Sequence, residues 1–279
     1  MQYTLECGRF RLPLDRPLVM GILNVTPDSF SDGGRFNAPE RAMAHAAQMI
    51  ADGVDIIDIG GESTRPGSAA QPLDEELRRI LPVLQALRDC GKPLSIDTCK
   101  PEVMRAALAA GADMINDING FMADGAVDAV RNGNSGLCIM HMQGDPRTMQ
   151  AAPRYGDVVA EVAAFLRERR DALEAAGVAR TRLCIDPGFG FGKTLAHNLE
   201  LLKHIGSMQA QLDLPVLAGL SRKSMLGAIT GKPVQERLAG SVAAAIAAVA
   251  RGARIVRVHD VAETVDALKI WQAVNQNNS

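Results

Sequence analysis

Residues 93–118, PLSIDTCKPEVMRAALAAGADMINDI, contain one complete unit of the pattern that decides the fold. A short apolar run, Pro93–Ile96, is followed by a polar turn and then by a helical stretch over Pro101–Ala110. The proline that begins this stretch suits the first turn of a helix, where its missing N–H would have no partner, and Gly111 falls where the helix should stop. The next apolar run, Met114–Ile118, follows directly. The stretch therefore predicts a strand, a helix and a second strand.

The same alternation recurs along the chain. The apolar runs are Leu18–Leu23, Ile56–Ile59, Pro93–Ile96, Met114–Ile118, Leu137–Met142, Leu183–Ile185, Pro215–Leu220 and Arg254–Val258. The helical stretches are Pro39–Asp52, Asp74–Cys90, Pro101–Ala110, Gly125–Arg131, Gly156–Ala176, Leu195–Ile205, Val234–Arg251 and Val261–Val274. Continuous apolar strands that alternate with helices indicate a parallel sheet covered on both faces. Eight such units within roughly 250 residues predict a closed (β/α)8 barrel, and the preceding segment Tyr3–Leu14 predicts a short hairpin that closes the barrel bottom.

Composition excludes several classes of function. The 279 residues carry 30 Lys and Arg against 32 Asp and Glu, a net charge of -2, so the chain lacks the basic surface of a general nucleic-acid binder. Aromatic residues make up only 4%, too few to stack bases along an extended groove. The longest apolar stretch, Val242–Ala250, falls far short of the roughly 18 residues that a membrane span needs. We therefore expect no nucleic-acid or membrane partner.

The cysteines and the N-terminal sequence indicate the compartment. The five cysteines are odd in number and show no C-x-x-C spacing, which disfavours a disulfide scaffold or a zinc site and fits a reducing compartment. The first residues, MQYTLECGRFRLPLDRPLV, have no apolar core of signal-peptide length. We expect a soluble cytoplasmic protein.

Polar residues follow nearly every predicted strand. They are Asn24; Glu62, Ser63, Thr64 and Arg65; Asp97; Asn116; His141; Asp186; Ser221, Arg222, Lys223 and Ser224; and Arg257 with His259. Polar residues are expected wherever a strand ends and a loop begins. That expectation does not account well for a carboxylate or an amide at the equivalent position of four strands. In a barrel the active site lies at the carboxyl ends of the strands, and charged groups facing its mouth are costly unless they meet a ligand or each other. The pattern therefore predicts a composite polar pocket.

Two motifs in the sequence resemble known sites without fitting them. The stretch PGFGFGKT has Pro187 where a phosphate-binding loop requires glycine, and its glycines are not spaced as in a dinucleotide site. We interpret those glycines as positions where a backbone loop passes close to a flat ligand or to another loop. The histidines lack the spacing of a zinc site. The sequence is still compatible with a hard metal ion held by one or two side chains together with substrate phosphates.

The chemistry of the strand-end residues indicates a ligand class. Asp97, Asn116 and Asp186 suit a flat heterocycle with an amidine-like edge, because a carboxylate can accept two parallel N–H bonds from such an edge. A second group, mostly cationic, follows the first, second and last strands, which are neighbours in a sequential barrel: Asn24, Arg65, Arg257 and His259. A site acidic on one side and cationic on the other predicts a heterocycle that carries a phosphate group.

The sequence resembles the dihydropteroate synthase family. The segments GILNVTPDSFSDGG, IDIGGESTRPG, SIDT, IMHMQGDP, IDPGFGFGK, SRKS and RVHD carry the resemblance, in order, over about residues 18–260. It implies a single pterin-binding barrel domain over residues 1–279. It also implies a transferase of folate biosynthesis that joins 6-hydroxymethyl-7,8-dihydropterin pyrophosphate to 4-aminobenzoate and releases pyrophosphate. The resemblance further implies Mg²⁺ as the cofactor, a homodimer, and a target of sulfonamide drugs.

The resemblance also implies roles for individual residues. The catalytic set would be Asn24, Asp97, Lys223, Arg257 and His259. The pterin would lie on Asp97, Asn116, Met140, Asp186, Lys223 and Arg257. The pyrophosphate would bind Asn24, Thr64, Arg65, Arg257 and His259, with Asn24 also touching Mg²⁺. The 4-aminobenzoate would lie near Phe30, Thr64, Pro66, Phe191, Lys223 and Ser224, and Phe30 and Asp32 would belong to the first loop.

Two other functions are compatible with a pterin-binding barrel. One is a non-catalytic paralogue that binds pterin without turnover. The intact residues of the proposed site argue against it: Asn24, Thr64, Arg65, Lys223, Arg257 and His259. The other is a pterin-dependent methyltransferase domain, which should need neither the cationic pyrophosphate cluster nor an aminobenzoate wall.

Overall fold

Eight parallel strands form the centre of the computed structural model, which describes residues 3–26, 38–63, 71–145 and 148–275. They are β3 (Leu18–Asn24), β4 (Ile56–Gly60), β5 (Leu94–Asp97), β6 (Met114–Asp117), β7 (Gly136–Met140), β8 (Leu183–Asp186), β9 (Leu217–Ala218) and β10 (Ile255–Val258). The sheet runs in the order β8-β7-β6-β5-β4-β3-β10-β9, and a parallel bridge between Ile185 and Val216 joins its two ends. The predicted closed (β/α)8 barrel is confirmed.

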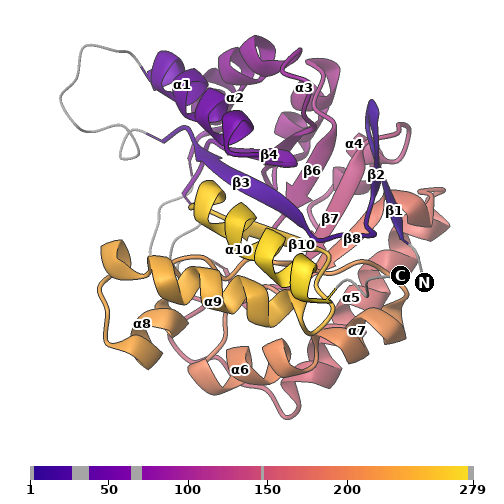
Figure 1. Ribbon diagram of the computed structural model, residues 1–279. Helices are drawn as coiled ribbons and strands as arrows, with labels where there is room; N and C mark the ends of the chain where they lie inside the picture. Colours follow the sequence, from indigo (N-terminus) through magenta and orange to yellow (C-terminus); the bar gives the residue numbers. More distant parts are fainter. Residues whose placement is uncertain (1–2, 27–37, 64–70, 146–147, 276–279) are drawn as a thin grey trace.

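Helices surround the strands on the outside of the barrel (Figure 1). They are α1 (Ala38–Ala51), α2 (Leu73–Leu87), α3 (Pro101–Ala109), α4 (Ala126–Val130), α5 (Val158–Ala175), α6 (Leu195–Lys203), α7 (Ile205–Leu212), α8 (Ser224–Thr230), α9 (Leu238–Val249) and α10 (Val261–Asn275). The expected helix stops are confirmed by left-handed backbone at each glycine: Gly53, Gly91, Gly111, Gly177 and Gly252. No helix within the described ranges is long and apolar enough to cross a membrane.

The predicted helical pattern is wrong in two places. The stretch predicted as one helix to Ile205 ends at Lys203, and α7 begins at Ile205, because His204 between them is not helical (φ -103°, ψ 15°). The helix predicted from Val234 begins at Leu238, after a 3-10 turn over Val234–Glu236, and the unpredicted α8 precedes both. The break lies at Arg237, which leaves helical geometry (φ -90°, ψ 13°) while its guanidinium donates to the carbonyls of Lys232 and Arg222.

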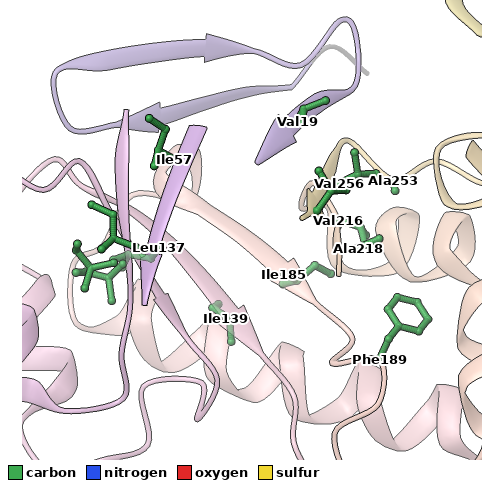
Figure 2. Close-up of a cluster of buried hydrophobic side chains, with 14 of the residues drawn as sticks. Val19, Ile57, Leu137, Ile139, Ile185, Phe189, Val216, Ala218, Ala253 and Val256 are labelled. Carbon is green, nitrogen blue, oxygen red and sulfur yellow. The ribbon is translucent and has the colours of Figure 1, made fainter. Parts of the chain in front are cut away.

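Alternate residues of each strand face opposite sides, so the strands separate two apolar layers. The outer layer packs the strands against the helices, and Figure 2 shows part of it, including Ile57, Leu137 and Ile185. The inner layer fills the lower part of the barrel with Met20, Ile56, Met114, Cys138, Cys184, Leu217 and Ile255. This filled interior leaves room for polar groups only toward the carboxyl ends of the strands.

An N-terminal hairpin closes the other end of the barrel, as predicted. It consists of β1 (Thr4–Cys7) and β2 (Phe10–Pro13), which pair antiparallel. Leu5 and Cys7 are fully buried within the inner layer. Arg9 fastens the turn, since its Nε and Nη2 donate to the two carboxylate oxygens of Asp113 at 2.9 Å each. All five cysteines are free thiols, as the sequence indicated.

Candidate active site

Above the apolar inner layer lies a layer of polar side chains, all buried except the partly exposed Arg257. Its members continue the inward-facing positions of the strands toward their carboxyl ends: Asp58, Ser95, Asp97, Asn116, Asp186 and Arg257. The carboxyl and amide groups of this layer are at most 8% exposed. The structure thus brings together the strand-end residues Asp97, Asn116, Asp186 and Arg257 predicted from the sequence.

Arg257 joins two carboxylates from neighbouring strands. Its Nε donates to Asp58 Oδ2 at 2.6 Å, and its Nη2 donates to Asp97 Oδ2 at 2.7 Å. Asn116 Nδ2 donates to the same Asp58 oxygen at 3.2 Å. Burial alone would lower the pKa of Arg257, but the charges of Asp58 and Asp97 raise it, so the guanidinium remains the counter-ion of this layer.

Asp58 and Ser95 are the residues of this layer that were not predicted from the sequence, and Asp58 is the charged one. It is fully buried, and its position two residues after inward-facing Ile56 follows the strand period. The period of two along the strand would therefore have been a sufficient signal. Asp58 was overlooked because it lies within β4 rather than at its end.

Several buried acceptor oxygens in this layer have no hydrogen-bond partner within the described part of the chain. They are Asp58 Oδ1, Asp97 Oδ1 and Asn116 Oδ1. The buried Ser95 hydroxyl also has no hydrogen-bond partner there. Buried polar groups in proteins nearly always have partners. Acceptors on adjacent strands that lack donors fit a ligand whose edge donates several hydrogen bonds.

Burial also shifts the titration of the site. It raises the pKa of Asp97 to about 7; the nearby Arg257 opposes the shift, and the charge of Asp58 adds to it. Burial raises the pKa of Asp186, against the opposing charge of Lys223, and it lowers the pKa of Lys223 to about 8. These shifts reflect charges removed from water.

The loop after β8 forms one wall of the mouth. Asp186 Oδ1 accepts the backbone N–H of Gly188 at 2.7 Å, and Lys223 Nζ donates to the carbonyl of Phe189. The same ammonium lies 4.7 Å from the centre of the Phe191 ring. The predicted residues Asp186, Lys223 and Phe191 therefore lie together, and exposed Ser224 follows Lys223 as the first residue of α8.

The glycines of this loop are explained by its packing against the backbone that follows β7. Gly188 and Gly192 have left-handed backbone (φ 70° and 61°). A Cβ on Gly188 would lie 1.8 Å from the carbonyl oxygen of His141, and one on Gly192 would lie 2.4 Å from that of Gln143. The interpretation that a backbone loop passes close to another loop is confirmed.

The loops after β9 and β10 are joined by two consecutive residue pairs. The Ser221 hydroxyl lies 3.0 Å from His259 Nδ1, and it accepts the backbone N–H of His259 at 3.2 Å. Arg222, in left-handed backbone (φ 57°), pairs with Asp260. These contacts hold His259 two residues beyond Arg257, next to the loop that carries Lys223.

The remaining predicted residues are placed as follows. Asn24 ends β3, and its Oδ1 lies 3.5 Å from where a Cβ of Gly60 would be, near Asp97. Met140 ends β7 and is buried opposite Asp186 in the strand register. The predictions for Phe30, Asp32, Thr64, Arg65 and Pro66 lie outside the described residues.

His141 does not join the polar pocket, contrary to the expectation drawn from its strand-end position. Its Nδ1 lies 2.9 Å from Lys193 Nζ, and its ring stacks edge-on against Phe165 with ring centres 5.0 Å apart. The physical reason is that buried Lys193 needs an acceptor. Burial lowers the pKa of His141 to about 3, which keeps the imidazole neutral for that role.

Comparisons with known proteins point to one family. The family model described as pterin binding enzyme matches residues 20–259. Dihydropteroate synthase of Neisseria meningitidis serogroup B is 49% identical over 282 residues, which cover 99% of each protein. The structure of Burkholderia cenocepacia dihydropteroate synthase complexed with 7,8-dihydropteroate has a TM-score of 0.89 and 57% identity, covering 98% of this chain and 97% of that one. That of Xanthomonas albilineans dihydropteroate synthase with 4-aminobenzoic acid has a TM-score of 0.94 and 54% identity, covering 99% and 100%.

The raised pKa of Asp97 predicts a pH-dependent stability cost. The folded state binds this proton more tightly than the unfolded chain, so ionising the carboxyl destabilises the fold; the cost is absent below about pH 4, grows as the pH rises and is complete above about pH 7. Asp97→Asn should remove it. The melting temperature of the variant, relative to the wild type, should therefore rise between pH 4 and pH 7 and then stay level. Thermal unfolding of both proteins across this pH range measures the difference in melting temperature, to which carboxyls common to both proteins do not contribute. A difference in melting temperature that does not change with pH would contradict the raised pKa of Asp97.

Proposed function

The chain belongs to the dihydropteroate synthase family of pterin binding enzymes, and from this premise we propose how its side chains carry out the reaction of the family. The reaction joins 6-hydroxymethyl-7,8-dihydropterin pyrophosphate to 4-aminobenzoate, forms 7,8-dihydropteroate and releases pyrophosphate. The observation that supports the proposal most directly is the set of buried, unpaired acceptor oxygens on adjacent strands at the barrel mouth.

The pterin edge lies on the acidic side of the mouth. Its pyrimidine ring presents neighbouring N–H donors, which match the acceptor oxygens of Asp97, Asn116 and Asp186. Lys223 supplies a donor beside Asp186. A Cβ on Gly219 would lie 3.6 Å from Asp186 Oδ2 and 3.8 Å from Lys223 Nζ, so both groups lie over this glycine. The buried side chain of Met140 and the stem of Arg257 pack against the flat ring.

The pyrophosphate lies on the cationic side. A guanidinium has five N–H donors, and two of those of Arg257 bind Asp58 and Asp97, which leaves others to face the leaving group. His259 follows β10, and Asn24 ends the adjacent strand β3. Thr64 and Arg65 complete the set in this proposal.

The 4-aminobenzoate lies against the loop after β8. The Phe191 ring provides an apolar wall, and Lys223 and Ser224 provide polar contacts at its end. Phe30, Thr64 and Pro66 form the rest of this subsite in the proposal.

The chemistry needs positioning and charge stabilisation more than it needs a base. The arylamine is neutral at pH 7, so its nitrogen lone pair attacks the methylene carbon of the pterin directly. A C–N bond forms, the C–O bond to pyrophosphate breaks, and the nitrogen then loses a proton to water. Arg257 and His259 stabilise the charge that develops on the leaving oxygen, while Asp97 and Asp186 hold the ring in line with the amine.

The donor set at the mouth fits Mg²⁺ bound mainly by substrate. No group of three His, Cys, Asp or Glu side chains that could hold a metal lies within the described ranges. Mg²⁺ usually keeps several waters and is bound by one or two protein oxygens plus substrate phosphates, and the amide oxygen of Asn24 is such a ligand. The ion would supply positive charge at the pyrophosphate oxygens.

Two further inferences concern assembly and compartment. The α9 sequence LAGSVAAAIAAV has no charged residue, and while Ala244 and Ala248 face the core, Leu238, Ala239 and Ala243 are exposed. A helix that is apolar all round is normally covered, so we infer a homodimer through this outer face. The five free thiols support a reducing, cytoplasmic setting.

The reaction assignment predicts equal amounts of dihydropteroate and pyrophosphate when the protein receives both substrates with Mg²⁺. Asn24→Ala should raise the Mg²⁺ concentration needed for half-maximal rate by about tenfold, since it removes the proposed protein ligand. Coupled detection of pyrophosphate across a Mg²⁺ titration measures both. Pterin binding without any product would instead indicate a non-catalytic paralogue.

Asp186→Asn should weaken binding of the pterin substrate by about 1–3 kcal/mol. The Gly188 N–H fixes an oxygen at one position of the side chain, so the new amide group must point toward Lys223 and the donor edge of the ligand. Calorimetric titration without aminobenzoate measures the affinity. Equal affinities for variant and wild type would contradict the proposed pose.

Ala243→Glu should convert the protein to a monomer with near-normal turnover, because it places a charge on the outer face of α9, away from the barrel mouth. Sedimentation velocity of both proteins at matched concentration measures the change. A wild-type monomer, or a variant dimer, would overturn the proposed face.

A further inference from the structure

Lys193 is a buried cation that lies outside the set of residues assigned to the substrates. The residue is only 3% exposed. Nζ donates to the carbonyls of Gly188 and Phe191 at 2.9 Å each, and it lies 2.9 Å from His141 Nδ1. Nζ also lies 3.4 Å from the carbonyl oxygen of His141. Burial lowers the pKa of Lys193 to about 7, and in its protonated form the three N–H donors are all used by these acceptors.

These bonds join two segments that shape the mouth. His141 follows β7, and the carbonyls belong to the glycine-rich loop after β8. The two segments are in backbone contact where Gly188 and Gly192 pass His141 and Gln143. Lys193 therefore fixes the loop from its outer side.

The loop is also held from the mouth side. Lys223 Nζ donates to the carbonyl of Phe189, which lies between the two carbonyls bound by Lys193. The ring of Phe191 is then left beside Lys223, with 4.7 Å between Nζ and the ring centre. The direction of that ring depends on the backbone of its own residue, whose carbonyl Lys193 binds.

We propose that Lys193 is a positioning residue for the aminobenzoate subsite: by binding the carbonyls of Gly188 and Phe191 it holds the Phe191 ring as the wall of that subsite. The proposal rests on the function proposed above for Phe191. Lys193 does not itself touch substrate, because it is buried and its donors are in use. Asp186 lies on β8 and its side chain is bonded by the N–H of Gly188 rather than by Lys193, so pterin binding should be affected much less.

The chain offers a matched control at the other end of the same strand. Arg182, 3% exposed, immediately precedes β8 and binds three backbone carbonyls, those of Val130, Arg131 and Ser135, at 2.7, 3.1 and 2.8 Å. It too is a buried cation that fastens loops by their carbonyls. It lies at the amino end of β8, whereas the mouth lies at the carboxyl end. Replacing either cation should destabilise the fold, but only Lys193 should affect a substrate.

The test compares Lys193→Met, Arg182→Met and Phe191→Ala with the wild type. Lys193→Met should raise the KM for 4-aminobenzoate by about tenfold and change the dissociation constant of the pterin substrate by less than about twofold. Arg182→Met should lower the melting temperature comparably and leave both constants unchanged. In the double variant Lys193→Met/Phe191→Ala, the KM should equal that of Phe191→Ala alone, since both changes remove the same wall.

A milder variant keeps the proposal testable if Lys193→Met does not fold. His141→Phe removes one acceptor of Lys193 but keeps an aromatic ring against Phe165, and it should raise the same KM by a smaller factor. An unchanged KM in the folded Lys193 variant, or an equal rise in Arg182→Met, would overturn the inference while the reaction assignment stands. An unchanged KM in Phe191→Ala would overturn the assignment of Phe191, and the inference with it.

Discussion

The ion bridge from Arg257 to Asp58 and Asp97 is the interaction on which the rest of the site depends. It places two carboxylates and one guanidinium inside a barrel whose lower interior is filled by apolar side chains. Charges in such a place are tolerated only when each is paired and hydrogen-bonded. Asp58 Oδ2 accepts hydrogen bonds from both Arg257 and Asn116. One buried carboxylate therefore orients a residue of the proposed cationic side and a residue of the acidic side. The separation of charge across the mouth thus follows from a single carboxylate on β4.

The apolar layer below determines where that charge can lie. Met20, Ile56, Met114 and Cys138 fill the lower interior, and the hairpin closes the end with Leu5 and Cys7. Among the described residues, the polar inward positions of the strands therefore lie in the next layer up, where the carboxyl ends of the strands meet. Because a barrel brings these ends into one ring, residues from β5, β6, β8 and β10 converge without any loop having to carry them there.

Much of this arrangement could be predicted from the sequence, and the failures have physical causes. The period of two along each strand was enough to place Asp97, Asn116, Asp186 and Arg257 inward, and the apolar runs were enough to place the eight strands. Rules based on strand ends missed Asp58, which lies inside its strand, and wrongly included His141, whose direction is set by Lys193. That contact joins residues 52 positions apart and exists only once the two loops pack. Local patterns also missed α8, a helix of 7 residues, and the break before α9, where Arg237 is held by carbonyls of another loop.

The unpaired acceptors of the inner layer give the site a basis for selectivity. A ligand whose edge donates hydrogen bonds satisfies oxygens such as Asp97 Oδ1 and Asn116 Oδ1. A flat heterocycle of the same shape without those donors would leave the acceptors buried and unpaired, and sites built to hydrogen-bond a substrate reject such analogues by about 10⁴–10⁵. When Asp97 is ionised, its second oxygen, Oδ1, strengthens this discrimination, because an unsatisfied carboxylate oxygen is more costly to bury than an unsatisfied neutral acceptor. The raised pKa of Asp97 is the corresponding cost in the ligand-free protein: the carboxyl is held where water cannot stabilise its charge, and the donor edge of the pterin replaces that stabilisation.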